Sequence, residues 1–283
     1  MSLDLENAQA GEPLLEGVSD SESHGAKTEA SSKRKRDDDS KPESKRAAKR
    51  KKTKKPKDVN DEALDLELGV NHAIAHMDGT LMADHIAQRT KRFQPDMSMV
   101  EVEDNHVPEK AILDTTSWTD GRTTDKLPGF LEKFAGERRA RKGYKLLNAP
   151  MEKGSPHTLI VAGAGLRAAD LARAVRKFQT KDCAVAKLFA KHIKLKEAIE
   201  TAKTTRMGIG VGTPQRIIDL LDDGALSATR LERIVIDASH IDQKKRGILD
   251  MKETQMPLVQ LLARKDLKER YGSGEGKVEL LYY

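Results

Sequence analysis

Two places in the sequence combine residues that could do chemistry at the end of a β-strand. The apolar run Arg233-Ile-Val-Ile-Asp237 ends in an aspartate. At the carboxyl edge of a parallel sheet such a carboxylate can hold Mg²⁺ or pair with a cation. Earlier in the chain, Gly212-Thr213-Pro214-Gln215-Arg216 is expected to begin a helix directly after a strand. Free N–H groups, the helix dipole and Arg216 favour a phosphate there. Alternatively, Thr213 caps the helix and Arg216 is a solvated surface charge.

Four further basic residues are expected at the same edge of the sheet. Arg167 follows the apolar run of residues 158–162, and Lys191, His192 and Lys194 follow that of residues 183–188. They could bind a nucleic-acid backbone or an acidic partner. Phosphate contacts of this kind set position and carry no sequence information. Since no aromatic residue lies beside these cations to stack a base, we predict no sequence-specific recognition.

A glycine-rich turn offers a dinucleotide site as an alternative. Gly163-Ala-Gly165-Leu-Arg-Ala168 fits the Gly-x-Gly-x-x-Ala fingerprint after a strand. The acid that would hold the ribose should end the next strand, but Asp182 precedes that strand. We therefore favour a tight turn and expect no cofactor. Cys183 is the single cysteine, which excludes a disulfide framework, favours a reducing compartment and predicts a small core residue.

Histidines at helical spacing could imitate a metal site. His72 and His76 lie four residues apart, with Asp84 and His85 further on. No Glu stands beside His72 as in a zinc protease, so we expect surface or interface histidines and no metal. Trp118 lies in a linking stretch, where we expect it to anchor that stretch against a core.

The elements that must position these residues alternate regularly after His157. Short apolar runs predict strands, and amphipathic stretches between them predict helices, which together imply βαβ crossovers. We predict a three-layer α/β domain with a parallel sheet over residues 125–283. The expected strands are residues 158–162, 183–188, 207–211, 233–237 and 277–283, and the expected helices are residues 127–144, 167–178, 195–203, 214–221 and 254–270.

Residues 58–124 are predicted to be an extended and amphipathic segment. Apolar residues alternate from Leu64 to Val70 and then recur at helical spacing from Ile74 to Ile86. Because no partner helix follows nearby, the helix must pack either on the domain or on another protein.

Residues 1–57 form a charged tail that we predict to be disordered. Residues 1–30 hold seven Asp or Glu against one Lys, and residues 31–57 hold fourteen Lys or Arg against four acids. A like-charged block with few apolar residues cannot bury enough surface to offset its ordering entropy. The chain has no apolar run of membrane-spanning length and no signal-peptide pattern at its start, so we expect no membrane association.

Two basic clusters in this tail resemble a bipartite nuclear import signal. Asp37-Asp38-Asp39-Ser40 separates them, and the tail could also contact RNA or serve only as a solvated linker. The clusters consist of Lys33, Arg34, Lys35 and Arg36, and of Lys49, Arg50, Lys51, Lys52, Lys54 and Lys55.

The Thr213-Pro214-Gln215-Arg216 turn and the strand ending at Asp237 together resemble the first RecA-like domain of a DEAD-box helicase. In that family these motifs contact the RNA backbone and coordinate magnesium. Here the second motif reads Asp237-Ala238-Ser239-His240, so alanine replaces a catalytic carboxylate. The phosphate-binding loop is also missing, since the nearest candidate is Gly121-Arg122-Thr123 with Thr116 in place of the first glycine. We also expect no second RecA-like domain. These departures predict a protein that is not an ATPase.

A closer resemblance, to the Cms-type family of subunits of the U3-containing 90S pre-ribosome, covers most of the chain. The motifs that carry it are Asn71-His-Ala-Ile-Ala-His-Met-Asp78, Ala83-Asp84-His85, Lys91-Arg92-Phe93, Leu188-Phe-Ala-Lys-His-Ile-Lys194 and Gly210-Val-Gly-Thr-Pro214.

This resemblance implies a nucleolar, non-catalytic assembly factor, monomeric within a large ribonucleoprotein. Its implied partners are pre-ribosomal RNA and small-subunit processome proteins. The alternatives are an ATP-dependent remodeller completed by a partner, a nucleotide-cofactor oxidoreductase, and a protein-only adaptor.

Overall fold

The computed structural model describes residues 62–136, 146–190, 193–272, 274 and 276–283. The predictions for residues 1–57, including the import clusters, and those for Lys191 and His192 lie outside these residues. In the part of the chain that is described, no helix is long and apolar enough to cross a membrane.

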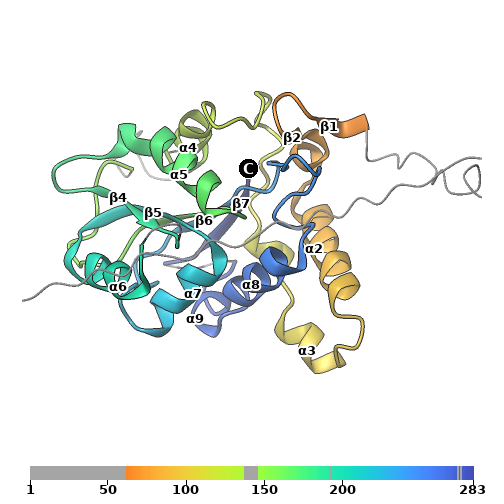
Figure 1. Ribbon diagram of the computed structural model, residues 1–283. Coiled ribbons are helices and arrows are strands. Elements are labelled where there is room, and N and C mark those ends of the chain that lie inside the picture. Colours follow the sequence, from red (N-terminus) through yellow and green to blue (C-terminus); the bar gives the residue numbers. More distant parts are fainter. Residues whose placement is uncertain (1–61, 137–145, 191–192, 273, 275) are drawn as a thin grey trace, which may run out of the picture. The chain divides into compact units, whose positions relative to one another are not determined.

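A five-stranded sheet organises the described chain (Figure 1). Its order is β4-β5-β3-β6-β7, and every neighbouring pair is parallel. The strands are β3 (Thr158–Val161), β4 (Ala184–Leu188), β5 (Met207–Gly212), β6 (Arg233–Ile236) and β7 (Glu279–Tyr282). A separate antiparallel pair consists of β1 (Leu64–Asp65) and β2 (Val70–Asn71).

Helices connect the strands and follow the expected alternation closely. The α-helices are α2 (Gly79–Phe93), α3 (Met99–Asp104), α4 (Leu127–Gly136), α5 (Gly165–Ala174), α6 (Leu195–Thr204), α7 (Pro214–Asp222), α8 (Lys252–Leu262) and α9 (Lys265–Lys268). Short 3₁₀ helices are η2 (His72–His76), η3 (Glu109–Ala111) and η4 (Val175–Phe178). The helix expected over residues 254–270 is divided into α8 and α9, because the chain is extended at Arg264.

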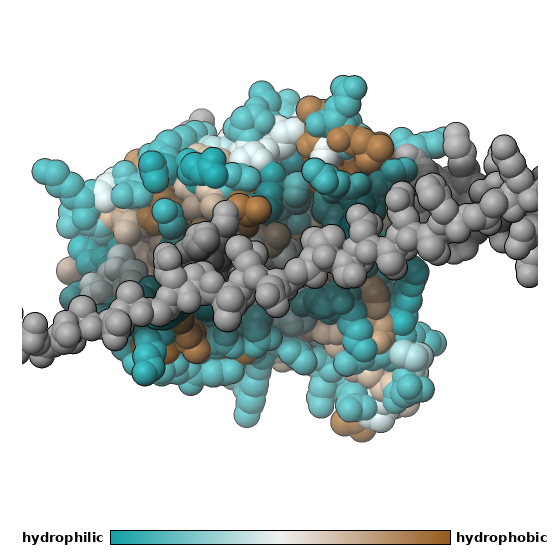
Figure 2. Space-filling model, in the orientation of Figure 1, coloured by the Kyte–Doolittle hydropathy of each residue, from teal (hydrophilic) through white to brown (hydrophobic). Residues whose placement is uncertain are grey.

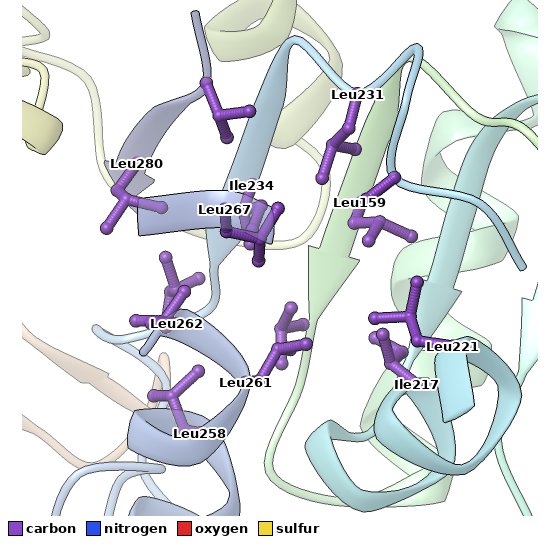
Figure 3. Packing of buried hydrophobic residues seen from close by; sticks show 14 of the residues in the cluster. Leu159, Ile217, Leu221, Leu231, Ile234, Leu258, Leu261, Leu262, Leu267 and Leu280 are labelled. Atoms are coloured by element: carbon purple, nitrogen blue, oxygen red, sulfur yellow. The ribbon is translucent and has the colours of Figure 1, made fainter. Parts of the chain in front are cut away.

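Both faces of the sheet are buried, and alternate residues of each strand face opposite sides. Leu159 and Ile234 pack with the helices α2, α6, α7, α8 and α9, as Figure 3 shows for the part under α7 and α8. Ile160 and Val235 pack with α4 and α5 on the other face. The predicted three-layer α/β fold with a parallel sheet is therefore confirmed.

The segment before the sheet packs against the domain in the same chain. Helix α2 lies beside α8, and the Gln255 side-chain amide donates to Thr90 Oγ1 at 2.6 Å. Arg89 pairs with Asp250 at 3.0 Å. The α2 residues Met82 and Ile86 join the core under α8. Of the two alternatives for the amphipathic helix, the structure therefore has the one that packs in cis.

The glycine before the Thr-Pro turn is explained by a close approach between the backbones of β5 and β4. A Cβ built on Gly212, the last residue of β5, would lie 2.1 Å from the carbonyl oxygen of Leu188 in β4. Such a contact is possible only for glycine. The turn that carries Thr213 is thus held directly against the end of β4.

Candidate functional site

The carboxyl edge of the sheet gathers most of the polar residues that the sequence singled out. Strand β6 ends at Ile236, and the Asp237 carboxylate accepts two hydrogen bonds from Arg167 at the start of α5, at 2.8 and 2.9 Å. The Arg167 guanidinium also donates to Thr124 Oγ1. The side chains are 12% and 2% exposed. The prediction that Asp237 pairs with a nearby cation is confirmed.

The pair with Asp237 sets the direction in which the pKa of Arg167 is shifted. Burial alone lowers the pKa of its guanidinium, but the hydrogen bonds and charge of Asp237 outweigh burial, so the pKa is raised above its ordinary value. The guanidinium predicted to face a nucleic-acid backbone thus forms an ion pair with a carboxylate of its own chain. Its bidentate geometry is that of a strong, charge-assisted contact.

Arg122 lies buried beside the last strand, in the loop that precedes α4. Its guanidinium donates to the carbonyl oxygen of Tyr282 in β7, and to the carbonyl oxygen and Oγ1 of Thr115 at 3.3 and 3.0 Å. Burial lowers the pKa of Arg122 to about 10, so the group stays charged at neutral pH. The sequence comparison with a helicase loop pointed to this residue without indicating that it is buried.

The chain that precedes α4 extends the sheet edge and is anchored by an aromatic contact. Leu113 N–H donates to the carbonyl oxygen of Leu280 at 2.8 Å, and Ile112 bridges the same residue in a parallel sense. Trp118 packs edge-on against Phe130 of α4, with ring centroids 5.7 Å apart. The expected anchoring role of Trp118 is confirmed.

The β1–β2 hairpin is hydrogen-bonded to the residues that follow β6. Asn71 N–H donates to the carbonyl oxygen of Ser239 at 2.7 Å, and Ile241 N–H donates to that of Gly69 at 2.9 Å. Between η2, the loop before α4 and Ser239 lies a cavity of about 290 Å³. Its lining includes His72, His76, Trp118, Asp120, Arg122 and Ser239.

The other candidate cations lie at the opposite end of the same edge, above β4 and β5. The Arg216 guanidinium donates to the carbonyl oxygen of Ile193 at 3.1 Å, which brings the start of α7 against the residues before α6. Lys194 is exposed, and Thr213 is half-buried. Pro214 occupies the first turn of α7 as expected, but the Thr213 side chain makes no capping hydrogen bond.

The remaining sequence motifs have structural explanations. The turn Gly163-Ala-Gly165 leads into α5, and a Cβ on Gly163 would lie 3.5 Å from Ile248, so a neighbouring loop covers the turn. Cys183 is buried with its Sγ 3.7 Å from the carbonyl oxygen of Leu146, which confirms it as a core residue. Within the described ranges, no three His, Cys, Asp or Glu side chains form a group that could hold a metal ion.

Comparison with known proteins decides the family. The family model CMS1, described as U3-containing 90S pre-ribosomal complex subunit, matches residues 22–283. The chain belongs to the CMS1 family. The resemblance seen in the sequence motifs is therefore confirmed.

Curated relatives of the CMS1 family are found in fungi and vertebrates. Protein CMS1 of Chaetomium thermophilum is 56% identical over 251 residues, which cover 89% of this chain and 96% of that protein. Protein cms1 of Schizosaccharomyces pombe is 28% identical, covering 77% and 74%. Protein CMSS1 of Homo sapiens is 31% identical, covering 58% and 55%.

Two solved structures, one of them of a DEAD-box splicing factor, align with parts of this CMS1 family member. The yeast splicing factor Prp28 matches with a TM-score of 0.35 and 19% identity, covering 49% of this chain and 29% of that one. The Saccharomyces cerevisiae Dbp5 in a complex matches with a TM-score of 0.33 and 15% identity, covering 52% and 36%. The chain thus spans only about a third of the solved chains it matches.

The face of this CMS1 family member that Figure 2 shows is mostly hydrophilic, with exposed apolar patches, and two groups of exposed apolar residues lie in the segment that precedes the sheet. One is the turn of the β1–β2 hairpin, where Leu66 and Leu68 are 59% and 57% exposed. The other is α3, where Met99 and Val100 are exposed and no side chain is buried. Neither group belongs to the polar edge of the sheet.

Proposed function

We propose that this chain is a non-catalytic assembly factor of the small-subunit pre-ribosome, which docks on pre-ribosomal RNA and processome proteins in the nucleolus. Membership of a family described as subunits of the U3-containing 90S pre-ribosomal complex supports a role in ribosome biogenesis. The basic clusters of residues 31–57 support nuclear import and salt-dependent attraction to RNA. In this proposal the positive charge of the tail attracts RNA, and the folded domain determines which site on the pre-ribosome is bound.

The non-catalytic part of the proposal rests on one observation: polar side chains at the carboxyl edge of the sheet are hydrogen-bonded to other groups of the same chain. Asp237, which in an NTPase would be free to hold a metal ion, accepts hydrogen bonds from Nε and Nη2 of Arg167. Arg122 donates to backbone oxygens of β7 and of its own loop. A metal ion carrying a triphosphate would have to displace Arg167 from Asp237, at a cost that hydrogen bonds to charged groups make large.

RNA contact is best supported above β4 and β5, where Lys194 is exposed next to Arg216 and Thr213. Lys191 and His192 remain candidates on sequence grounds. Arg167 is a weaker candidate than its position suggested, because its donors are already used by Asp237 and Thr124. Contacts of this type position the protein on a backbone and leave base identity to other factors.

The test combines RNA crosslinking in cells, mapped to peptides, with sedimentation of the tagged chain on a sucrose gradient. We expect crosslinks near residues 191–216 and sedimentation with 90S particles. Lys194→Glu together with Arg216→Gln should reduce both signals several-fold. Lys265→Glu, which changes another exposed lysine, on α9, is the matched control and should leave both unchanged.

Three outcomes would replace the proposal. Sedimentation with 90S particles without any RNA crosslink would identify a protein-only adaptor. Release of inorganic phosphate from ATP by the full chain, alone or with RNA, would identify a remodelling enzyme. Binding of NAD(H) at micromolar concentration would favour the oxidoreductase alternative.

A further inference from the structure

Three buried polar atoms of residues around the cavity beside Ser239 have no hydrogen-bond partner among the described residues. They are Trp118 Nε1, Arg122 Nε and Ser239 Oγ. All three residues line the cavity of about 290 Å³ between η2 and the loop before α4. A buried donor without an acceptor costs about 1–3 kcal/mol, so native proteins rarely leave several in one place. Their common location indicates a place where a hydrogen-bond acceptor binds.

Arg122 adds a positive charge that no carboxylate of the described residues neutralises. Its side chain is 2% exposed, and among the residues described no carboxylate lies within ion-pair distance of it. Its hydrogen-bond acceptors in the protein are neutral oxygens of Thr115 and Tyr282. A buried charge with only neutral partners carries a large desolvation penalty, which an anion in contact with it would offset.

The number and origin of the donors indicate which anion fits. One N–H is on an indole, one is on a guanidinium, and the hydroxyl of Ser239 follows the end of β6. Donors from three separate parts of the chain match a tetrahedral group, which presents oxygens in several directions, better than a planar carboxylate with two. We propose that this cavity binds a phosphate group, supplied by free phosphate, a nucleotide or an RNA backbone.

The other charged groups at the cavity are compatible with a phosphate. His72 and His76 lie at its exposed rim, where either imidazole can donate a further hydrogen bond. Asp120 also lines the cavity but is exposed, so water screens its repulsion. The cavity lies at the β7 end of the sheet, whereas Lys194 and Arg216 lie at the β4 end. It is therefore a separate site from the RNA contact proposed above, and the inference does not rest on that function.

The single tryptophan of the sequence makes the cavity directly observable. The indole N–H resonance of the ¹⁵N-labelled full chain reports on Trp118 alone. The chain is titrated at constant ionic strength with inorganic phosphate, with ATP and with a short single-stranded RNA, and sodium chloride and acetate serve as reference anions. We expect a saturable shift of this resonance with at least one phosphate-bearing probe, and the probe that saturates at the lowest concentration identifies the source.

Variants separate binding from folding. Ser239→Ala removes one donor and no packing volume of consequence, and it should weaken phosphate binding about tenfold or more. Ser227→Ala, away from the cavity, is the control and should bind as the unmodified chain does. Absence of a saturable shift with all three probes, an equal response to acetate, or unchanged affinity in Ser239→Ala would each overturn the inference.

These failures are distinguishable from failure of the proposed function. Loss of the phosphate response, with sedimentation on 90S particles intact, would remove the cavity site alone. A saturable response to ATP followed by its hydrolysis would support the site and contradict the non-catalytic function.

Discussion

Substitution of Asp237 by alanine gives a sharp test of whether the strand-end carboxylate is structural. In the structure its two oxygens accept hydrogen bonds from Arg167, and the aspartate side chain is almost fully buried. Asp237→Ala therefore leaves a guanidinium in a buried place with Thr124 as its remaining side-chain partner. If Asp237 instead served ligand binding, its replacement by alanine would leave the stability unchanged or raise it, because such groups are often held at a cost to stability.

The expected loss follows from burial of the pair. Removing one partner of a buried ion pair costs about 3–5 kcal/mol. Because Arg167 is 12% exposed and retains the contact to Thr124, we expect the lower end, about 3 kcal/mol. For a domain of roughly 150–250 residues, 1 kcal/mol shifts Tm by about 2–4 °C, so Tm should fall by about 6–12 °C.

The measurement is urea denaturation and thermal unfolding of the full chain, followed by circular dichroism. Asp170→Ala on α5 is the matched control, since the exposed pair of Asp170 with Arg173 should contribute less than about 0.5 kcal/mol. Replacing both partners, as Arg167→Met with Asp237→Ala, should recover part of the stability because no charge is left unpaired. An Asp237→Ala protein as stable as the unmodified chain, or more stable, would refute the structural role.

Three further outcomes are expected. Burial lowers the pKa of His240, so the unfolded chain binds a proton more readily than the folded chain, and the free energy of unfolding should fall as pH drops below about 6.5. Between pH 7.5 and pH 5.5, denaturation should show a smaller loss of stability for His240→Gln than for His76→Gln. Equal losses in the two variants would contradict this. Gly212→Ala places a methyl group 2.1 Å from a carbonyl oxygen of β4 and should cost about 1–3 kcal/mol or more, whereas Gly121→Ala, with 3.9 Å to its nearest neighbour, should cost less in the same melts. Deleting residues 31–57 should reduce nuclear accumulation of a tagged chain in microscopy, and an unchanged nuclear signal would count against an import function.

Much of the fold could be predicted because it is encoded locally. The apolar run at Thr158–Val161 predicts a strand, and the pattern from Pro214 to Asp222 predicts a helix. The structure places both within a residue or two of the expected bounds. The pairing of Asp237 with a cation was also predictable, since a buried carboxylate at a strand end needs a positive partner. The identity of that partner was not predictable.

What the sequence determined by itself is the alternation of strands and helices, the contrast between charged tail and nearly neutral body, and the motifs that indicate the CMS1 family. Only the tertiary structure decided that Arg167 meets Asp237 across 70 residues and that Arg122 is buried beside an open cavity. Periodicity records whether a side chain faces the core, because burial repeats along each element. It does not record which elements meet, since that depends on the strand order β4-β5-β3-β6-β7 and on the hairpin packed over its edge.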